Sequence, residues 1–275
     1  KDRILSKAKL AFIGGGNMTT SLIAGLIEKG YPANQITVSN RGQEKLIQLN
    51  KKFGIHTTTD NSFAASGAEV VLLAVKPQMV KIACQALSAS LKHQPLVISI
   101  AAGVQSESLQ QWLGKDIPII RCMPNTPSLV QTGAAGLFAN TNVSHAQRKL
   151  ATEILDAVGM SCWLEKEEDI DIVTAVSGSG PAYFFLFMEA MEKTAVDLGL
   201  NQEAAHKLVL QTALGAAKMA TEDTLDPAEL RRRVTSPGGT TEAAIETFIE
   251  GDILGLVNKA MVSAVKRAQA MAKDK

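Results

Sequence analysis

Three consecutive glycines, Gly14–Gly16, follow the apolar run Leu10–Ile13 directly. Bare backbone at such a point lets main-chain N–H groups approach a phosphate, and the N-terminus of a following helix favours negative charge. Gly14 and Gly16 occupy the first two positions of a G-x-G-x-x-G dinucleotide fingerprint, and Thr19 stands at the third. We therefore predict a cofactor-binding turn, with slightly looser helix packing at Thr19; a strand-to-helix turn without a ligand is the alternative.

The end of the second expected strand, Val38-Ser39-Asn40-Arg41, carries no carboxylate. NAD-preferring proteins place Asp or Glu there to bind the ribose 2′-hydroxyl. Arg41, with the small polar residues Ser39 and Asn40, can instead hold a 2′-phosphate by charge-assisted hydrogen bonds. The segment therefore predicts NADP as cofactor, with NADPH preferred and NADH possible; a solvated turn is the alternative.

Three further segments end expected strands: Ala74–Pro77, Ile100–Gly103 and Arg121–Pro127. In an open α/β sheet, ligands lie beyond the carboxyl ends of the strands, and small residues there leave room for a nicotinamide ribose. The prolines alone are equally consistent with turns, and Asn17 is expected to cap the first helix. The candidate cofactor residues are Gly14, Gly15, Gly16, Asn17, Met18, Ser39, Asn40, Arg41, Asn61, Ala74, Val75, Lys76, Pro77, Ala101, Ala102, Met123, Pro124 and Asn125.

A second glycine turn, Ser236–Thr241, lies directly before the apolar-periodic stretch Ala243–Ile249. Its N–H groups at a helix start suit a carboxylate, and Ser236 and the two threonines add hydroxyls. A cap and turn between two helices is the alternative. The segment Ser177–Tyr183 is expected to be a loop entering a helix, and it stays open whether its two serines bind a ligand or cap that helix.

Composition excludes several functions. The 275 residues hold 28 basic and 27 acidic side chains, a net charge of +1, which gives no electrostatic basis for binding nucleic acid or a membrane surface. We expect no membrane-spanning stretch and a cytoplasmic protein. Three cysteines and four histidines without ligand spacing predict reduced thiols and no metal site.

The first half of the chain alternates short apolar runs with amphipathic stretches, which is typical of a doubly wound parallel sheet with crossover helices. The expected strands are 10–13, 36–39, 70–75, 96–100 and 117–122, with weaker ones at 56–58, 134–139 and 162–164. The expected helices between them are 17–29, 43–53, 77–91, 106–113 and 144–158.

Beyond residue 166 only helical periodicity remains, which predicts an α/β Rossmann-like domain at 1–165 and an all-α domain at 166–275. The stretch Tyr183–Met188 is apolar on every face, so it must be enclosed. A second subunit is the expected cover, and a helix buried within a monomer is the alternative. The expected helices are 169–176, 181–198, 202–221, 227–234, 241–249 and 253–272.

The motifs IGGGNM, AVKP, AAG, RCMPNTP, SGSGPAYFF and SPGGTTEAA, in this order and spacing, resemble pyrroline-5-carboxylate reductase over nearly the whole chain. The resemblance implies reduction of L-1-pyrroline-5-carboxylate to L-proline by NAD(P)H, the last step of proline biosynthesis. It also implies a Rossmann domain, a helical dimerisation domain, and homodimers that in some members assemble further into decamers, as pentamers of dimers.

The resemblance also assigns roles in the second glycine turn. It makes Thr241 the donor to the imine nitrogen, and it places Glu167 near the substrate. A threonine is a weak acid, so we expect Thr241 to orient a proton, while most of the rate comes from alignment of the reacting carbons. The implied substrate-binding residues are Glu167, Ser236, Gly238, Gly239, Thr240 and Thr241.

Two other functions remain as alternatives. One is a different NADP-linked dehydrogenase, of the 3-hydroxyacid dehydrogenase or ketopantoate reductase type, in which Lys193, Lys207 or Lys218 would have to act as acid and base. The other is a non-catalytic NADP(H)-binding regulator. The complete SPGGTT segment argues against the second.

Overall fold

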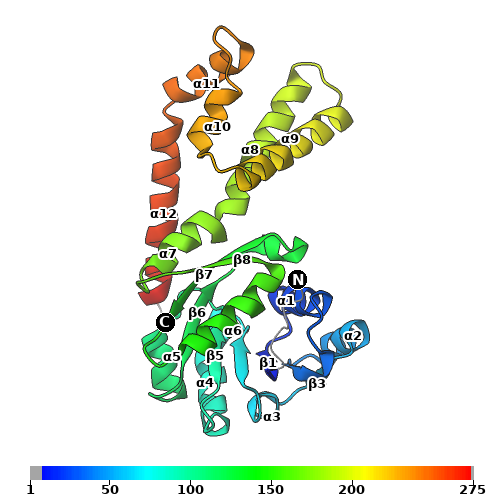
Figure 1. Ribbon diagram of the computed structural model, residues 1–275, viewed down its shortest axis with the longest axis vertical. Coiled ribbons are helices and arrows are strands. Elements are labelled where there is room, and N and C mark those ends of the chain that lie inside the picture. The colour runs from blue at the N-terminus through cyan, green and yellow to red at the C-terminus, as the bar shows by residue number, and fades with distance from the viewer. Residues whose placement is uncertain (1–7, 274–275) are drawn as a thin grey trace. The chain divides into compact units, whose positions relative to one another are not determined.

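The computed structural model describes residues 8–273, and the chain divides into two compact units (Figure 1). The first unit contains the chain up to Ser179 together with the stretch from Ala264, and the second is Gly180–Ser263. This division falls later than residue 165, because the helical segment that begins at Asp169 still packs against the sheet. The domain boundary at 165/166 stays a prediction.

An eight-stranded sheet forms the centre of the first unit. Its first six strands all run parallel, as the sequence predicts, which confirms the doubly wound α/β fold. The seventh runs antiparallel to the sixth, and the eighth runs parallel to the seventh, so one edge of the sheet is reversed. In spatial order the strands are β3 (His56–Thr58), β2 (Ile36–Ser39), β1 (Leu10–Ile13), β4 (Val70–Leu73), β5 (Leu96–Ser99), β6 (Ile119–Met123), β7 (Gly133–Ala139) and β8 (Gly159–Trp163).

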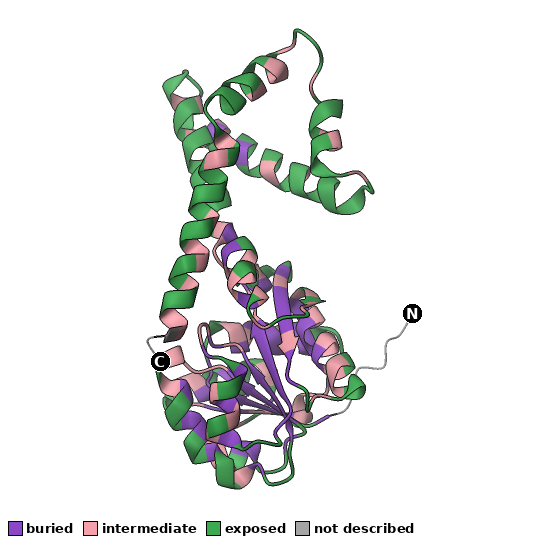
Figure 2. Cartoon of the chain, turned by 90° about the vertical axis from the view of Figure 1, so that its left-hand side faces the viewer, coloured by how far each residue is buried: buried purple, intermediate pink, exposed green. Residues whose placement is uncertain are grey.

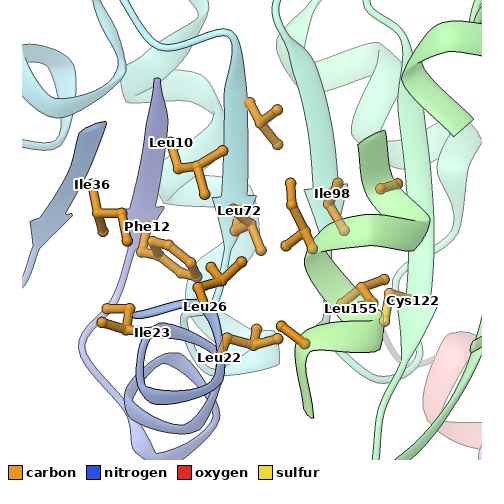
Figure 3. Close-up of a cluster of buried hydrophobic side chains, with 14 of the residues drawn as sticks. Leu10, Phe12, Leu22, Ile23, Leu26, Ile36, Leu72, Ile98, Cys122 and Leu155 are labelled. Atoms are coloured by element: carbon orange, nitrogen blue, oxygen red, sulfur yellow. The ribbon is translucent and has the colours of Figure 1, made fainter. Parts of the chain in front are cut away.

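Helices cover both faces of this sheet. The side chains of β1 show why: Leu10 and Phe12 join one buried cluster (Figure 3), while Ala11 and Ile13 join another, as the two-residue period of a strand requires. α1 (Asn17–Glu28), α2 (Gln43–Phe53) and α6 (His145–Leu155) pack on the face of the first cluster. α3 (Asn61–Ala65), α4 (Val80–Leu87) and α5 (Ser106–Leu113) pack on the face of the second.

Beyond β8 the described residues form helices and their connections, which confirms the predicted all-α half. α7 (Asp169–Val173) continues through a π-helical turn, Thr174–Gly178, into α8 (Gly180–Asp197). The predicted loop is therefore wrong for Ser177 and Gly178, which belong to the π turn, whereas Pro181 lies in the first turn of α8 as predicted. α9 (Gln202–Glu222), α10 (Pro227–Arg233), α11 (Thr240–Glu250) and α12 (Ile253–Lys273) follow.

The two units differ in burial. Figure 2 shows buried residues concentrated around the sheet, while the helices of the second unit are mostly exposed. Within Gly180–Ser263 the buried residues are Gly180, Ala205 and Val209. Large apolar side chains stand open instead, with Phe184 68% and Phe185 63% exposed. The second unit thus presents apolar faces that the chain itself does not cover.

The helical stretch Asp169–Asp197 is long and apolar enough to cross a membrane by length and composition alone. The expectation that no stretch reaches that length is therefore wrong. Core helices of proteins outside membranes pass the same test, so the finding is weak evidence for a span.

The three cysteines carry no disulfide, as the sequence predicts. Cys84 and Cys122 are buried and Cys162 is exposed. Burial raises the pKa of the Cys84 thiol to about 12 and raises the pKa of Cys122 well above its usual range. Both buried thiols are therefore unreactive.

Candidate active site

Gly14 and Gly16 have different roles in the glycine turn after β1. Gly14 has φ +109°, and a Cβ there would stand 2.6 Å from the Ala74 carbonyl oxygen, so the close approach of the turn to β4 requires glycine. A Cβ on Gly16 would meet nothing within 4 Å. Gly16 is exposed at the start of α1, so the space beside its backbone is open to a ligand. This division of roles fits a pyrophosphate-binding turn.

The start of α1 corrects two expectations. The helix begins at Asn17 with Gly16 as its N-cap and no capping side chain, so the predicted Asn17 cap is wrong. Thr19 is fully buried, and its hydroxyl donates to the Gly14 carbonyl at 2.7 Å. The looser packing expected at Thr19 is therefore absent, because the hydroxyl ties the helix back to the turn.

The end of β2 holds one accessible cation. Arg41 is exposed, and Asn40 accepts from the Gly15 N–H at 3.3 Å through Oδ1. Ser39 is fully buried, and its hydroxyl donates to Oδ1 of Asn61 at 2.7 Å. The Ser39 hydroxyl thus orients the Asn61 amide, and the predicted role of Ser39 beside a 2′-phosphate stays a prediction.

The ends of β4 and β5 supply small residues at the same edge, since these strands run parallel to β1. Ala74 and Val75 are half-buried, and Lys76 is exposed. Pro77 opens a short 3-10 turn, which confirms its expected place in the first turn of a helix. Ala101 follows β5 and is 8% exposed. The structure thus brings these predicted residues together with the glycine turn at one edge.

A buried ion pair links β6 to the segment before α7. Nη1 of Arg121 lies 2.7 Å from Oε1 of Glu167, and the two side chains are 6% and 21% exposed. The Ser106 N–H at the start of α5 donates to the same oxygen at 2.7 Å, and the Ser106 hydroxyl donates to Oε2. Burial raises the pKa of the neighbouring Asp171 carboxyl, while Arg121 opposes this rise.

These contacts occupy the Glu167 carboxylate with three donors inside the first unit. The geometry therefore favours a structural role for Glu167, as cap of α5 and partner of Arg121, over the implied contact with substrate. The sequence analysis missed Arg121 and Ser106. The available signal was an arginine inside an otherwise apolar strand, since a buried guanidinium requires an acidic partner.

Asn125, just after β6, is also occupied. It is 9% exposed, its Oδ1 accepts from the Ala134 N–H at 2.8 Å, and its Nδ2 donates to the Ser177 carbonyl at 3.1 Å. The side-chain amide thus bonds the protein at both ends, and its predicted role as a cofactor ligand stays a prediction. Met123 and Pro124 are half-buried beside it.

The two serines of the segment before α8 make hydrogen bonds within the helical turn. Its hydroxyl donates to the Val173 carbonyl at 3.1 Å, which is a bond within the helix and not a cap. Ser179 donates its N–H to the Thr174 carbonyl at 2.8 Å, five residues earlier, and this bond defines the π turn. The Ser177 hydroxyl therefore does not cap α8, and whether either serine binds a ligand stays open.

The second glycine turn lies between α10 and α11 in the second unit. Gly238 has φ +71°, and the Gly239 N–H closes the turn on the Ser236 carbonyl at 3.0 Å. Gly239 is the N-cap of α11 and provides no side chain, so the first N–H groups of the helix depend on other partners. The Gly238 N–H donates to Oε2 of Glu242 at 2.6 Å, and Thr241 is half-buried. The turn thus already accommodates a carboxylate.

The comparisons with known proteins match both parts of the chain. Residues 167–271 match the family model described as pyrroline-5-carboxylate reductase dimerisation, and residues 9–103 match the model described as NADP oxidoreductase, coenzyme F420-dependent. The pyrroline-5-carboxylate reductase of Pseudomonas aeruginosa is 51% identical over 98% of this chain and 99% of its own length. That of Vibrio alginolyticus is 46% identical, over 96% of this chain and 98% of its own length.

Solved structures agree. The structure of a pyrroline-5-carboxylate reductase from Coxiella burnetii is 47% identical and superposes with a TM-score of 0.95 over 97% of this chain and 99% of that one. A pyrroline carboxylate reductase from Plasmodium falciparum, solved with NADP bound, is 28% identical with a TM-score of 0.84, over 98% of this chain and 99% of that one.

Proposed function

Because the chain belongs to the pyrroline-5-carboxylate reductase family, we propose that it reduces the C=N bond of L-1-pyrroline-5-carboxylate with a hydride from NAD(P)H, giving L-proline. The observation that carries this proposal is the 51% identity to a reductase of this name across nearly the whole length of both chains. The fold and the two glycine turns supply the parts that such a reaction requires.

The first unit suits a nicotinamide dinucleotide. The open backbone at Gly16 and the uncapped start of α1 fit a pyrophosphate, and the small residues after β4 and β5 leave room for the nicotinamide end. When bound, the cofactor supplies the hydride. The chain's own residues align the cofactor with the substrate and exclude competing water.

The second glycine turn suits the substrate carboxylate. Its N–H groups lie at the N-terminus of the eleven-residue α11, where negative charge is favoured, and Ser236 and Thr240 add exposed hydroxyls. Hydride addition leaves electron density on the imine nitrogen, so that nitrogen must be protonated or receive a hydrogen bond. We assign this donor role to the Thr241 hydroxyl.

Arg41 is proposed to set a preference for NADPH. Replacing Arg41 by alanine is expected to weaken NADPH binding roughly ten- to a hundredfold, on the scale of a charged hydrogen bond, and to change NADH binding less than about twofold. Fluorescence titration of both cofactors measures this. Lys51→Ala, an exposed cation on α2, is the control and leaves both affinities unchanged. An equal loss of affinity for NADPH and NADH would contradict the proposal that Arg41 binds the 2′-phosphate.

A second copy of the chain is proposed to cover the helical unit. The matched dimerisation model spans 167–271, and the exposed Phe184 and Phe185 lie inside it. A homodimer accounts for these apolar faces and for the membrane-like composition of Asp169–Asp197. Assembly into decamers and location in the cytoplasm stay predictions.

A steady-state assay tests the function. Purified protein with NADPH and pyrroline-5-carboxylate is expected to consume NADPH and to form proline. Oxidation or reduction with hydroxy acids only, and none with the imine, would support the other dehydrogenase class. NADPH binding without turnover would support a regulator.

A further inference from the structure

Residues at every second position of β6 and its continuation contact the stretch from Glu167 to Gly178, which contains α7 and the π turn. Arg121 holds Glu167 at 2.7 Å. Met123 occupies the space beside Gly178, where a Cβ would stand 2.6 Å from the methionine Cε. Asn125 donates to the Ser177 carbonyl at 3.1 Å. Alternate residues of an extended strand share one face, so this face of β6 holds the segment at three points.

The Ser177 carbonyl lacks the hydrogen-bond donor that a regular α-helix would provide. In a continuous α-helix this carbonyl would accept from the N–H four residues later, at position 181. Position 181 is proline, which has no N–H and whose ring crowds that carbonyl. The Asn125 amide supplies the missing hydrogen bond. Without it, the Ser177 carbonyl would be a poorly satisfied acceptor within the π-helical turn.

Asn125 is itself held in place. Its Oδ1 accepts from the Ala134 N–H at the start of β7, so the amide joins β6, β7 and the π turn. Both ends of the side chain are engaged, which fixes which end donates and which accepts. A side chain held at both ends has little freedom to move, so it fixes the position of the Ser177 carbonyl relative to the start of β7.

We propose that Asn125 is a positioning residue for the reduction: it holds the π-helical turn Thr174–Gly178 against the carboxyl end of β6 by bonding the Ser177 carbonyl, which Pro181 leaves without its α-helical donor. The proposal rests on the function proposed above, because the π turn adjoins the carboxyl edge of the sheet, where the cofactor is proposed to react. π turns are rare and frequently lie at functional sites.

Asn125→Ala is expected to lower kcat roughly ten- to a hundredfold, the scale of a misplaced reacting geometry, while the dissociation constant for NADPH changes less than about threefold. Single-turnover rates and cofactor titration separate the two quantities. A weaker NADPH affinity with unchanged kcat would mean that Asn125 binds cofactor directly, and would overturn the proposal. Unchanged kcat and unchanged affinity would overturn it as well.

Asn140→Ala is the matched control. Asn140 is 8% exposed and also bridges backbone groups at the β6–β7 pair, accepting from the Ile119 N–H at 3.0 Å and donating to the Ile117 carbonyl at 3.1 Å. It lies at the opposite end of β6. Its loss is expected to lower the unfolding midpoint as much as Asn125→Ala does and to leave kcat unchanged. If both variants lower kcat equally, the effect is one of general stability and the proposal fails.

Asn125→Asp keeps the proposal testable if the alanine variant does not fold. The introduced carboxyl still accepts from the Ala134 N–H, but when ionised it cannot donate to Ser177. When protonated it can donate, and burial favours the protonated form. The variant's kcat, relative to the native protein, is therefore expected to recover as the pH falls. A ratio that does not change with pH contradicts the role of the donated hydrogen bond.

Pro181→Ala probes the cause directly, because it restores an N–H at position 181. The unfolding free energy lost through Asn125→Ala is expected to be smaller in the Pro181→Ala background than in the native one. Equal losses would overturn the link to proline. If the proposed function is wrong, the native protein does not reduce the imine at all. If only this inference is wrong, the native protein still turns over the imine.

Discussion

Replacing Thr241 by alanine is expected to lower kcat for imine reduction roughly ten- to a thousandfold, the loss typical of one positioned donor, while NADPH affinity stays nearly unchanged. The reason is that the hydroxyl lies at the start of α11, beside the turn proposed to hold the substrate carboxylate. Hydride addition without a donor at nitrogen is slow. Steady-state kinetics with NADPH titration measure both quantities.

Two variants control this result. Thr241→Ser keeps a hydroxyl at the position and is expected to retain most of the activity. Thr247→Ala removes another hydroxyl of the same helix, one that donates to the Ala243 carbonyl at 3.0 Å. This variant is expected to leave kcat unchanged. Full activity in Thr241→Ala would remove Thr241 from the mechanism.

Glu167→Ala is expected to cost about 3 kcal/mol or more of unfolding free energy, since it leaves the buried Arg121 guanidinium without its main partner. It also removes the acceptor for the first N–H of α5 and for the Ser106 hydroxyl. Urea unfolding at a fixed protein concentration measures the loss, because an associating protein gains stability with concentration.

Glu203→Ala is the matched control for that measurement. Glu203 pairs with Lys207 on the surface of α9, where both side chains are more than two-thirds exposed, at 77% and 71%. Such a pair contributes less than about 1 kcal/mol. If Glu167→Ala destabilises no more than Glu203→Ala, the ion pair of Arg121 is not structural, and the implied contact between Glu167 and substrate regains support.

Much of the first unit follows from sequence periodicity. Leu10–Ile13 and Val70–Leu73 are fully apolar and short, which favours parallel strands buried on both faces. The reversed direction of β7 and β8 does not follow, because a strand's periodicity is the same in either direction. The better signal is the connection between β6 and β7, which is short and contains no α-helix and therefore favours an antiparallel pair.

The candidate site was predictable only in part. The glycine turn was, because the close approach of Gly14 to Ala74 and the open space beside Gly16 both depend on the absence of side chains. The roles of Ser39 and Asn125 were not, because local sequence does not say whether a polar residue after a strand points to solvent or into the protein. The π turn was missed because glycine and proline signal a break, whereas here Asn125 compensates for the proline from outside the helix.

The small number of buried residues in Gly180–Ser263 has a thermodynamic consequence. A unit whose interior holds Gly180, Ala205 and Val209 cannot offset its loss of chain entropy by internal packing alone. Its helices gain cooperativity only when another apolar surface meets them, so acquiring tertiary order and acquiring a partner become one equilibrium. Dilution should then melt the helices of this unit before the sheet.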